Sequence, residues 1–321
     1  MKLQQRIWII FILLSLTLLV VAGFVQPETV FPVLNSLLMI GLGLGLGLLL
    51  ARRFGLSWGL FGAGALTFIG SQVLHIPFNS YLLNPLLAKI TPQPTPGSSQ
   101  LALWALLLGL SAGIFEETTR YLVLRFWRKD VTTWKQSLMF GAGHGGTEAI
   151  ILGVLAFVGF IQISYYTRMG TDALQASMDS TRLEALNATI TTYWNYPWYE
   201  HLWGAFERLS VLPVHLAATV MVFRSVNRKQ PAWYLAAILW HALVDFAAVF
   251  ASQTWSIPLT EGIIFLLGLT GVGIVFALRT PDPIPVEEPT PSIQPEPAPL
   301  PLEPVQEKPI TKESLEESRY D

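Results

Sequence analysis

Apolar residues form long runs along the first 279 positions of the chain, and most polar residues lie between these runs. A run of about 18 or more apolar residues can cross a bilayer as a helix. The runs predict eight membrane helices, at residues 7–25, 31–50, 56–76, 101–123, 136–160, 204–223, 231–251 and 258–278. A further surface helix is predicted at 179–192, inside the longest polar connection. The pattern therefore predicts an all-α fold, a polytopic membrane helical bundle.

Composition agrees with this prediction. The 321 residues are 52% hydrophobic and only 13% charged, whereas a soluble domain usually has about 25% charged residues. The chain has no Cys, which excludes disulfides and metal sites built on Cys ligands.

Charge divides the chain into two predicted domains. Residues 1–279 contain 17 basic and 12 acidic residues, whereas residues 280–321 contain 3 basic and 10 acidic residues. The second part is rich in Pro and Glu and poor in apolar side chains, so it cannot offset the entropy lost on folding. We predict an integral membrane domain at 1–279 and a disordered tail at 280–321.

The basic residues between the predicted helices indicate the orientation. If the N-terminus is cytoplasmic, twelve Lys and Arg residues of the first part lie on the cytoplasmic side and three lie on the other. Cytoplasmic loops are enriched in Lys and Arg, so both termini are predicted in the cytoplasm. The run at 7–25 is long for a signal peptide, and we expect it to stay as an anchor. The predicted location is a multi-pass position in the bacterial plasma membrane.

Ionisable residues interrupt four of the predicted helices. Each charged side chain costs roughly 3 kcal/mol at the bilayer centre, so such residues usually have a partner or a function. They are Glu116, Glu117, Arg120, His144, Glu148, Glu207, Arg208, His215, His241 and Asp245.

Their spacing predicts a common layer. Glu116, His144, His215 and His241 each lie 9 or 10 residues from the predicted cytoplasmic ends of their helices. At about 1.5 Å per residue this is roughly 13–15 Å deep, close to the middle of the membrane. Asp245 follows His241 by four residues, as Glu148 follows His144, which places each acid on the face of its histidine, one turn further from the cytoplasm.

A glutamate beside several histidines in a wet cavity is typical of hydrolytic chemistry. The carboxylate can act as general base, or histidines can hold Zn²⁺, whose bound water is then deprotonated. Both routes stay open on spacing alone, and Zn²⁺ is the cofactor expected for the second. The predicted catalytic residues are Glu116, Glu117, Arg120, His144, Glu148, His241 and Asp245. The predicted metal ligands are His144, His215 and His241.

These motifs resemble those of known membrane peptidases. Glu116-Glu117-Thr-Thr-Arg120, Phe140-Gly-Ala-Gly-His144 and His241-Ala-Leu-Val-Asp245 are similar, in the same order, to the CAAX-prenyl-protease and bacteriocin-processing clan. The segment from Gly143 to Glu148, the Glu207-Arg208 pair and His215 resemble the YhfC-type intramembrane metalloprotease family more closely. The resemblance implies hydrolysis of a peptide bond within the bilayer, with Glu116 or Glu117 activating water.

The resulting functional prediction is an intramembrane endopeptidase. Its expected partners are the lipid bilayer and a membrane-embedded or lipid-anchored peptide substrate, and no nucleic acid. The alternative is a proton- or ion-coupled transporter, because buried Glu, His and Asp residues also form ion pathways. Glu207 and Arg208 lie nearer the outer surface, where a structural ion pair is at least as well supported as a catalytic role.

Overall fold

The computed structural model describes residues 23, 25–91, 94–170, 174–175 and 178–281, together with Pro309, Thr311, Lys312 and Leu315. The chain separates into two units, Met1–Asp282 and Pro283–Asp321, and the helices described below belong to the first. The predicted helix at 7–25 and most of the predicted tail at 280–321 lie outside the described residues. These two predictions, with the domain boundary between 279 and 280, therefore stay predictions.

The described part of the chain is helical and contains no strand. Its elements are α2 (Pro27–Phe54), α3 (Trp58–Phe78), η1 (Asn79–Leu83), α4 (Asn84–Ile90), α5 (Ser99–Leu122), η2 (Val123–Trp127), α6 (Trp134–Met169), α8 (Ser180–Asn195), η3 (Trp198–Leu202), α9 (Trp203–Arg228), α10 (Ala232–Thr254) and α11 (Ile257–Ala277). Among these residues, seven helical stretches are long and apolar enough to cross a membrane. They correspond to seven of the eight predicted spans and confirm the all-α, multi-pass bundle.

Local sequence explains where several helices begin and end. Thr133 and Gln136 form a capping box at the start of α6, so two backbone N–H groups that lack helical partners are satisfied. The Asp179 side chain accepts from the Arg182 backbone N–H at 2.9 Å and starts α8, which confirms the predicted surface helix. Gly55 ends α2 in a left-handed conformation, with φ of 65°.

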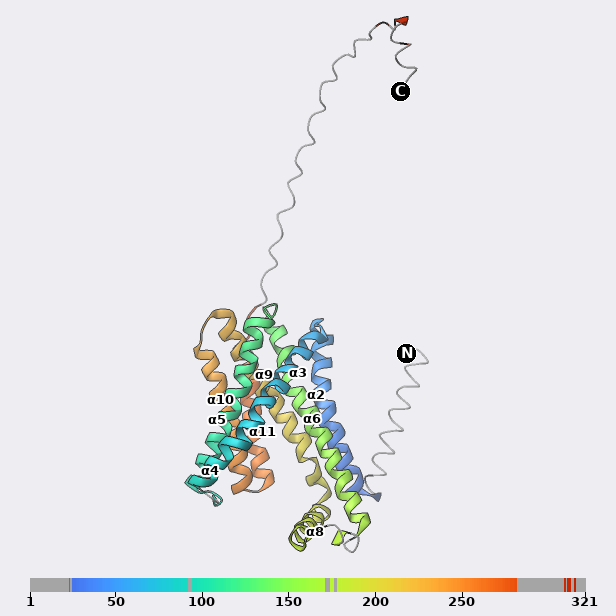
Figure 1. Ribbon diagram of the computed structural model, residues 1–321, viewed down its shortest axis with the longest axis vertical. Coiled ribbons are helices and arrows are strands. Elements are labelled where there is room, and N and C mark those ends of the chain that lie inside the picture. The colour runs from blue at the N-terminus through green and yellow to red at the C-terminus, as the bar shows by residue number, and fades with distance from the viewer. Residues whose placement is uncertain are drawn as a thin grey trace. The chain divides into compact units, whose positions relative to one another are not determined.

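The bundle has two chemically different ends. We call "basic end" the end at which α2, η2 and α9 finish and α3, α6 and α10 begin. Its connections carry Arg52, Arg53, Arg125, Arg128, Lys129, Arg228 and Lys229. We call the other end the "opposite end"; there α6 finishes, α9 begins, and the helices α4 and α8 lie (Figure 1).

Two glycines allow α3 and α6 to approach closely beside the later site. A Cβ atom added to Gly64 would overlap the carbonyl oxygen of Phe140, and one added to Gly143 would overlap the carbonyl oxygen of Phe61. Because backbone atoms cannot move aside cheaply, both positions require Gly. The contact brings α3 against the backbone of α6 at His144.

A cluster of buried hydrophobic side chains fills most of the basic half of the bundle. It contains the first turns of α6, including Trp134 and Phe140, and the second half of α9, including Phe223. Trp240 of α10 packs in the same cluster, and its indole N–H donates to the Val214 carbonyl oxygen at 3.2 Å. Between the basic end and the layer of Glu116, His144, His215 and His241, the bundle is therefore tightly packed with hydrophobic side chains.

Candidate active site

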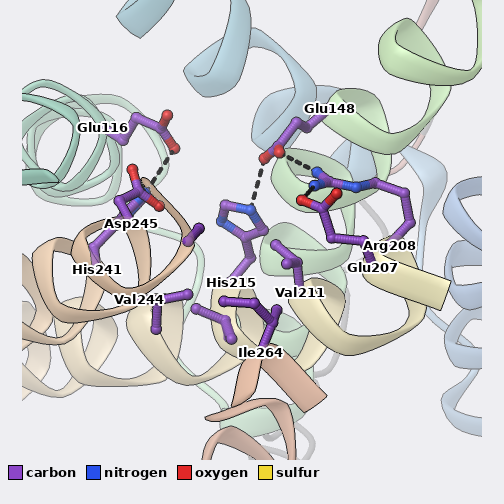
Figure 2. Close-up of a pocket in the computed structure, with 12 residues that line it drawn as sticks. Glu116, Glu148, Glu207, Arg208, Val211, His215, His241, Val244, Asp245 and Ile264 are labelled. Carbon is purple, nitrogen blue, oxygen red and sulfur yellow. Dashed lines mark hydrogen bonds and ion pairs between the residues drawn. The ribbon is translucent and has the colours of Figure 1, made fainter. Parts of the chain in front are cut away.

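Four helices bring the predicted residues into one polar cluster. Glu116, Glu117 and Arg120 come from α5, His144 and Glu148 from α6, His215 from α9, and His241 and Asp245 from α10. Glu116, Glu148, His215, His241 and Asp245 line one cavity together with Glu207 and Arg208 (Figure 2). The residues predicted to lie at the same membrane depth are thus close together in the structure.

Glu116 occupies the centre of the cluster. Its Oε2 atom lies 2.9 Å from His144 Nε2 and 3.7 Å from His241 Nε2. Its Oε1 atom accepts a hydrogen bond from Gln72 Nε2 on α3 at 3.0 Å. Gln72 was missed by the sequence analysis, although it belongs to a polar stripe with Thr67, Ser71 and His75. Spacings of three to four residues place this stripe on one helix face.

Glu117 has a different position. It accepts hydrogen bonds from Arg120 and from His241 Nδ1, the latter at 2.7 Å, and its side chain is fully buried. Glu116, by contrast, lines the cavity. Arg120 hydrogen-bonds Glu117 and also forms an ion pair with Glu116, at 3.7 Å, as their spacing of four residues on one helix face favours. Glu116 is thus the carboxylate that faces the cavity, and Glu117 is buried behind it.

The contacts of Glu117 orient the His241 ring. Because Nδ1–H donates to Glu117, the neutral ring has its lone pair on Nε2, on the side of Glu116 and Asp245. A carboxylate that binds the outer nitrogen of an imidazole is the usual support for a ligating or basic histidine. Asp245 Oδ2 lies 3.7 Å from His241 Nε2, so the two side chains share one helix face, as their spacing predicted.

His144 lies at the bottom of the cluster and is fully buried. The Thr67 hydroxyl donates to the Gly64 carbonyl oxygen at 2.6 Å. The Thr67 hydroxyl oxygen can therefore accept a hydrogen bond from His144 Nδ1–H, at 2.8 Å. His144 Nε2 then points at Glu116, so the buried imidazole supports a carboxylate that lines the cavity.

Glu148 orients a different histidine from the one that precedes it on α6. Its Oε2 atom lies 2.6 Å from His215 Nε2, and its Oε1 atom pairs with Arg208. The spacing had suggested His144 as its partner, because both residues share a helix face. His215 Nδ1 in turn accepts from Arg120 Nη2 at 2.8 Å. Arg208 also pairs with Glu207, so the predicted ion pair is present but belongs to the cavity wall.

The cavity measures about 90 Å³, enough for a few water molecules. Carboxylates and imidazoles line one part of it, and aliphatic side chains line the rest. Its walls are Glu116, Glu148, Glu207, Arg208, Val211, Val214, His215, His241, Val244, Asp245, Ala248 and Ile264.

Three of these residues have the geometry of a metal site. Donor atoms of Glu116, His215 and His241 all lie within 4.8 Å of one another, and the three residues are buried. This set shares two members with the predicted set of His144, His215 and His241, and a carboxylate replaces His144. Two His and one carboxylate form a known type of catalytic zinc site.

The charges around the site also fit a bound cation. Glu116, Glu117, Glu148, Glu207 and Asp245 face two guanidinium groups, Arg120 and Arg208. When all five carboxylates are ionised, the arginines leave three negative charges unbalanced, which is costly away from water. The residues present therefore fit a divalent metal such as Zn²⁺.

Fold and site together define a class: a multi-pass integral membrane protein with a buried Glu–His site inside its helical bundle. Sequence comparison gives this class a family. The profile described as YhfC intramembrane metalloprotease matches residues 36–264 of the chain. The chain therefore belongs to the YhfC intramembrane metalloprotease family, as its motifs predicted.

A curated relative supports this assignment. It is described as "Uncharacterized membrane protein YhfC" from Bacillus subtilis (strain 168) and is 34% identical over 226 residues. The aligned region covers 70% of this chain and 85% of the relative. No solved structure shows a significant match.

Proposed function

We propose that the protein is an intramembrane endopeptidase that hydrolyses a peptide bond of a membrane-embedded or lipid-anchored substrate in the bacterial plasma membrane. The observation that carries the proposal is the position of Glu116. Its carboxylate lines a cavity inside the bundle, with imidazoles of three other helix segments around it. The family description as a metalloprotease agrees with this chemistry.

Glu116 supplies the general base in the metal-free form of the reaction. Its carboxylate accepts a proton from water while the water oxygen adds to the carbonyl carbon of the peptide bond. The carboxyl group then donates this proton to the leaving nitrogen as the C–N bond breaks. Gln72 Nε2 donates to the carboxylate at 3.0 Å, and His144 Nε2, at 2.9 Å, donates to it when the His144 ring is doubly protonated. His241 can donate to the developing oxyanion through Nε2 when its ring is doubly protonated, since its Nδ1–H is already engaged by Glu117.

A metal held by Glu116, His215 and His241 would polarise the carbonyl group and make bound water more acidic. If Glu116 were a ligand, a second carboxylate would be needed to accept a proton from water. Asp245 fits this role, because Glu148 is held by both Arg208 and His215. The two forms of the reaction therefore assign different importance to Asp245.

Cleavage in membranes tests the proposal. The protein is co-expressed with a panel of tagged single-span membrane proteins, and the tagged fragments are followed by electrophoresis. Glu116→Gln is expected to lower cleavage at least about 100-fold, because the base or ligand is lost. Glu261→Gln is the matched control, since it changes a buried acid of α11 outside the cavity walls. Equal cleavage by Glu116→Gln and wild type would exclude this site.

Metal analysis of the purified protein separates the two forms. If a metal takes part, chelation abolishes cleavage, Zn²⁺ restores it, and Asp245→Asn is as inactive as Glu116→Gln. If the reaction is metal-free, chelator has no effect and Asp245→Asn keeps substantial activity. A protein that moves ions across vesicles and cleaves no peptide would instead support the transporter alternative.

A further inference from the structure

The cavity walls are distributed unevenly along the helices. On α9 they are Glu207, Arg208, Val211, Val214 and His215, all in the half nearer the opposite end. On α10 they begin at His241 and continue through Val244 and Asp245 to Ala248, again towards the opposite end. No wall residue lies closer to the basic end than the layer of Glu116, His215 and His241.

Exposure of the ionisable side chains follows the same direction. The side chains of Glu117, Arg120 and His144 are fully buried. The side chain of Glu116 is 7% exposed and that of Glu148 is 17% exposed. Those of Glu207 and Asp245 reach 37% and 38%. The exposure of the acidic side chains thus increases from the centre of the bundle to the opposite end, whereas Arg208, paired with Glu148 and Glu207, is 7% exposed.

The basic side of the layer is closed. On this side, Glu117 is hydrogen-bonded to Arg120 and to His241, and His144 is hydrogen-bonded to Glu116. Closer to the basic end lies the hydrophobic cluster that includes Phe140 and Trp240. Water and substrate have no open path through such close packing.

We infer that the site is reached from the extracytoplasmic face, through a mouth formed by Glu207, Asp245 and Ala248. This follows because the basic end is predicted to be cytoplasmic, whereas the cavity walls and the most exposed carboxylates lie towards the opposite end. The inference rests on the proposed function and specifies its substrate class. The substrate is a membrane-anchored polypeptide whose cleaved bond lies in the outer half of the bilayer or just outside it.

The absence of Cys from the chain permits a direct test by thiol labelling. Ala248→Cys places a thiol in the mouth, and Leu243→Cys places one on the same helix, where the native side chain is 50% exposed outside the cavity walls. Gln230→Cys places one in the exposed turn at the basic end. Each variant is expressed in spheroplasts and treated with a membrane-impermeant maleimide.

Ala248→Cys is expected to be labelled in intact spheroplasts, at least tenfold faster than Leu243→Cys, which faces lipid. Gln230→Cys is expected to react only after permeabilisation. Labelling of Gln230→Cys in intact spheroplasts, or of Ala248→Cys only after permeabilisation, would overturn the inference. So would reaction of Ala248→Cys with a lipid-soluble maleimide alone, because the mouth would then open sideways into lipid.

The labelling does not depend on hydrolysis, so the two proposals can fail separately. Ala248→Cys is also labelled in the Glu116→Gln background, where cleavage is expected to be absent. A labelled mouth in a protein that cleaves none of the panel counts against the endopeptidase alone. An unlabelled mouth in an active protein counts against the extracytoplasmic opening alone.

Discussion

The half of the bundle at the basic end and the half at the opposite end are both helical, but one is tightly packed and the other contains the cavity. In the basic half, large side chains such as Trp134, Phe140 and Trp240 interlock, and the backbones of α3 and α6 touch at glycines. In the opposite half, α6, α9 and α10 present carboxylates and imidazoles to a cavity. The tightly packed half at the basic end therefore fixes the positions of the proposed catalytic groups, which the half with the cavity could not hold by itself.

Replacement of a buried arginine is expected to give the largest difference in stability between the two halves. Arg120 is fully buried between Glu117, Glu116 and His215, and its removal leaves two buried carboxylates without a cationic partner. Arg120→Ala is expected to lower the free energy of unfolding by about 3–5 kcal/mol. SDS titration in detergent micelles measures this loss. The double variant Arg120→Ala/Glu117→Gln should recover part of it, because one unpaired charge is gone.

Arg208 provides the matched substitution in the open half. It also pairs with two carboxylates, but Glu148 and Glu207 are partly exposed. Water can solvate these carboxylates after Arg208→Ala, so the expected loss is about 1 kcal/mol. Equal destabilisation by Arg120→Ala and Arg208→Ala would contradict this difference in solvent access between the half at the basic end and the half with the cavity.

The glycine contact gives the next effect in size. An Ala at Gly143 would press against the Phe61 backbone, and overpacking of this kind costs about 1–3 kcal/mol. Gly41→Ala on α2 is the control, because a Cβ there has no atom within 4 Å. Gly143→Ala is expected to lower the unfolding midpoint in SDS, whereas Gly41→Ala leaves it unchanged or raises it slightly. A midpoint unaffected by Gly143→Ala would show that α3 and α6 can separate freely.

The sequence predicted the layer because depth depends only on the number of residues between a side chain and the end of its helix. Glu116, His215 and His241 meet for this reason. It did not predict the pairing of Glu148 with His215, because spacing within one helix shows which residues share a face and not which neighbour that face contacts. Thr67 and Gln72 were missed for a related reason. Single neutral polar residues are common in membrane helices, and only their common stripe on α3 indicated a contact.

The smallest expected effect lies outside the membrane, where solvent weakens every charge pair. At the basic end, Arg128 donates two hydrogen bonds to Asp130, and these bonds hold the pKa of the Asp130 carboxyl below its ordinary value of 3.8. This contribution to stability is complete above about pH 4, where the unfolded carboxyl is also ionised, and is lost as pH falls through the lower folded pKa.

Asp130 is 60% exposed, so the pair contributes less than about 1 kcal/mol. Asp130→Asn should therefore lower the unfolding temperature slightly at pH 6 and not at all near pH 2, as measured by scanning fluorimetry in detergent. The wild type should lose this difference between pH 4 and 2. A loss at pH 6 as large as that of Arg120→Ala would mean that charge pairs at the surface and in the dry half are equivalent, which the low dielectric of the packed half argues against.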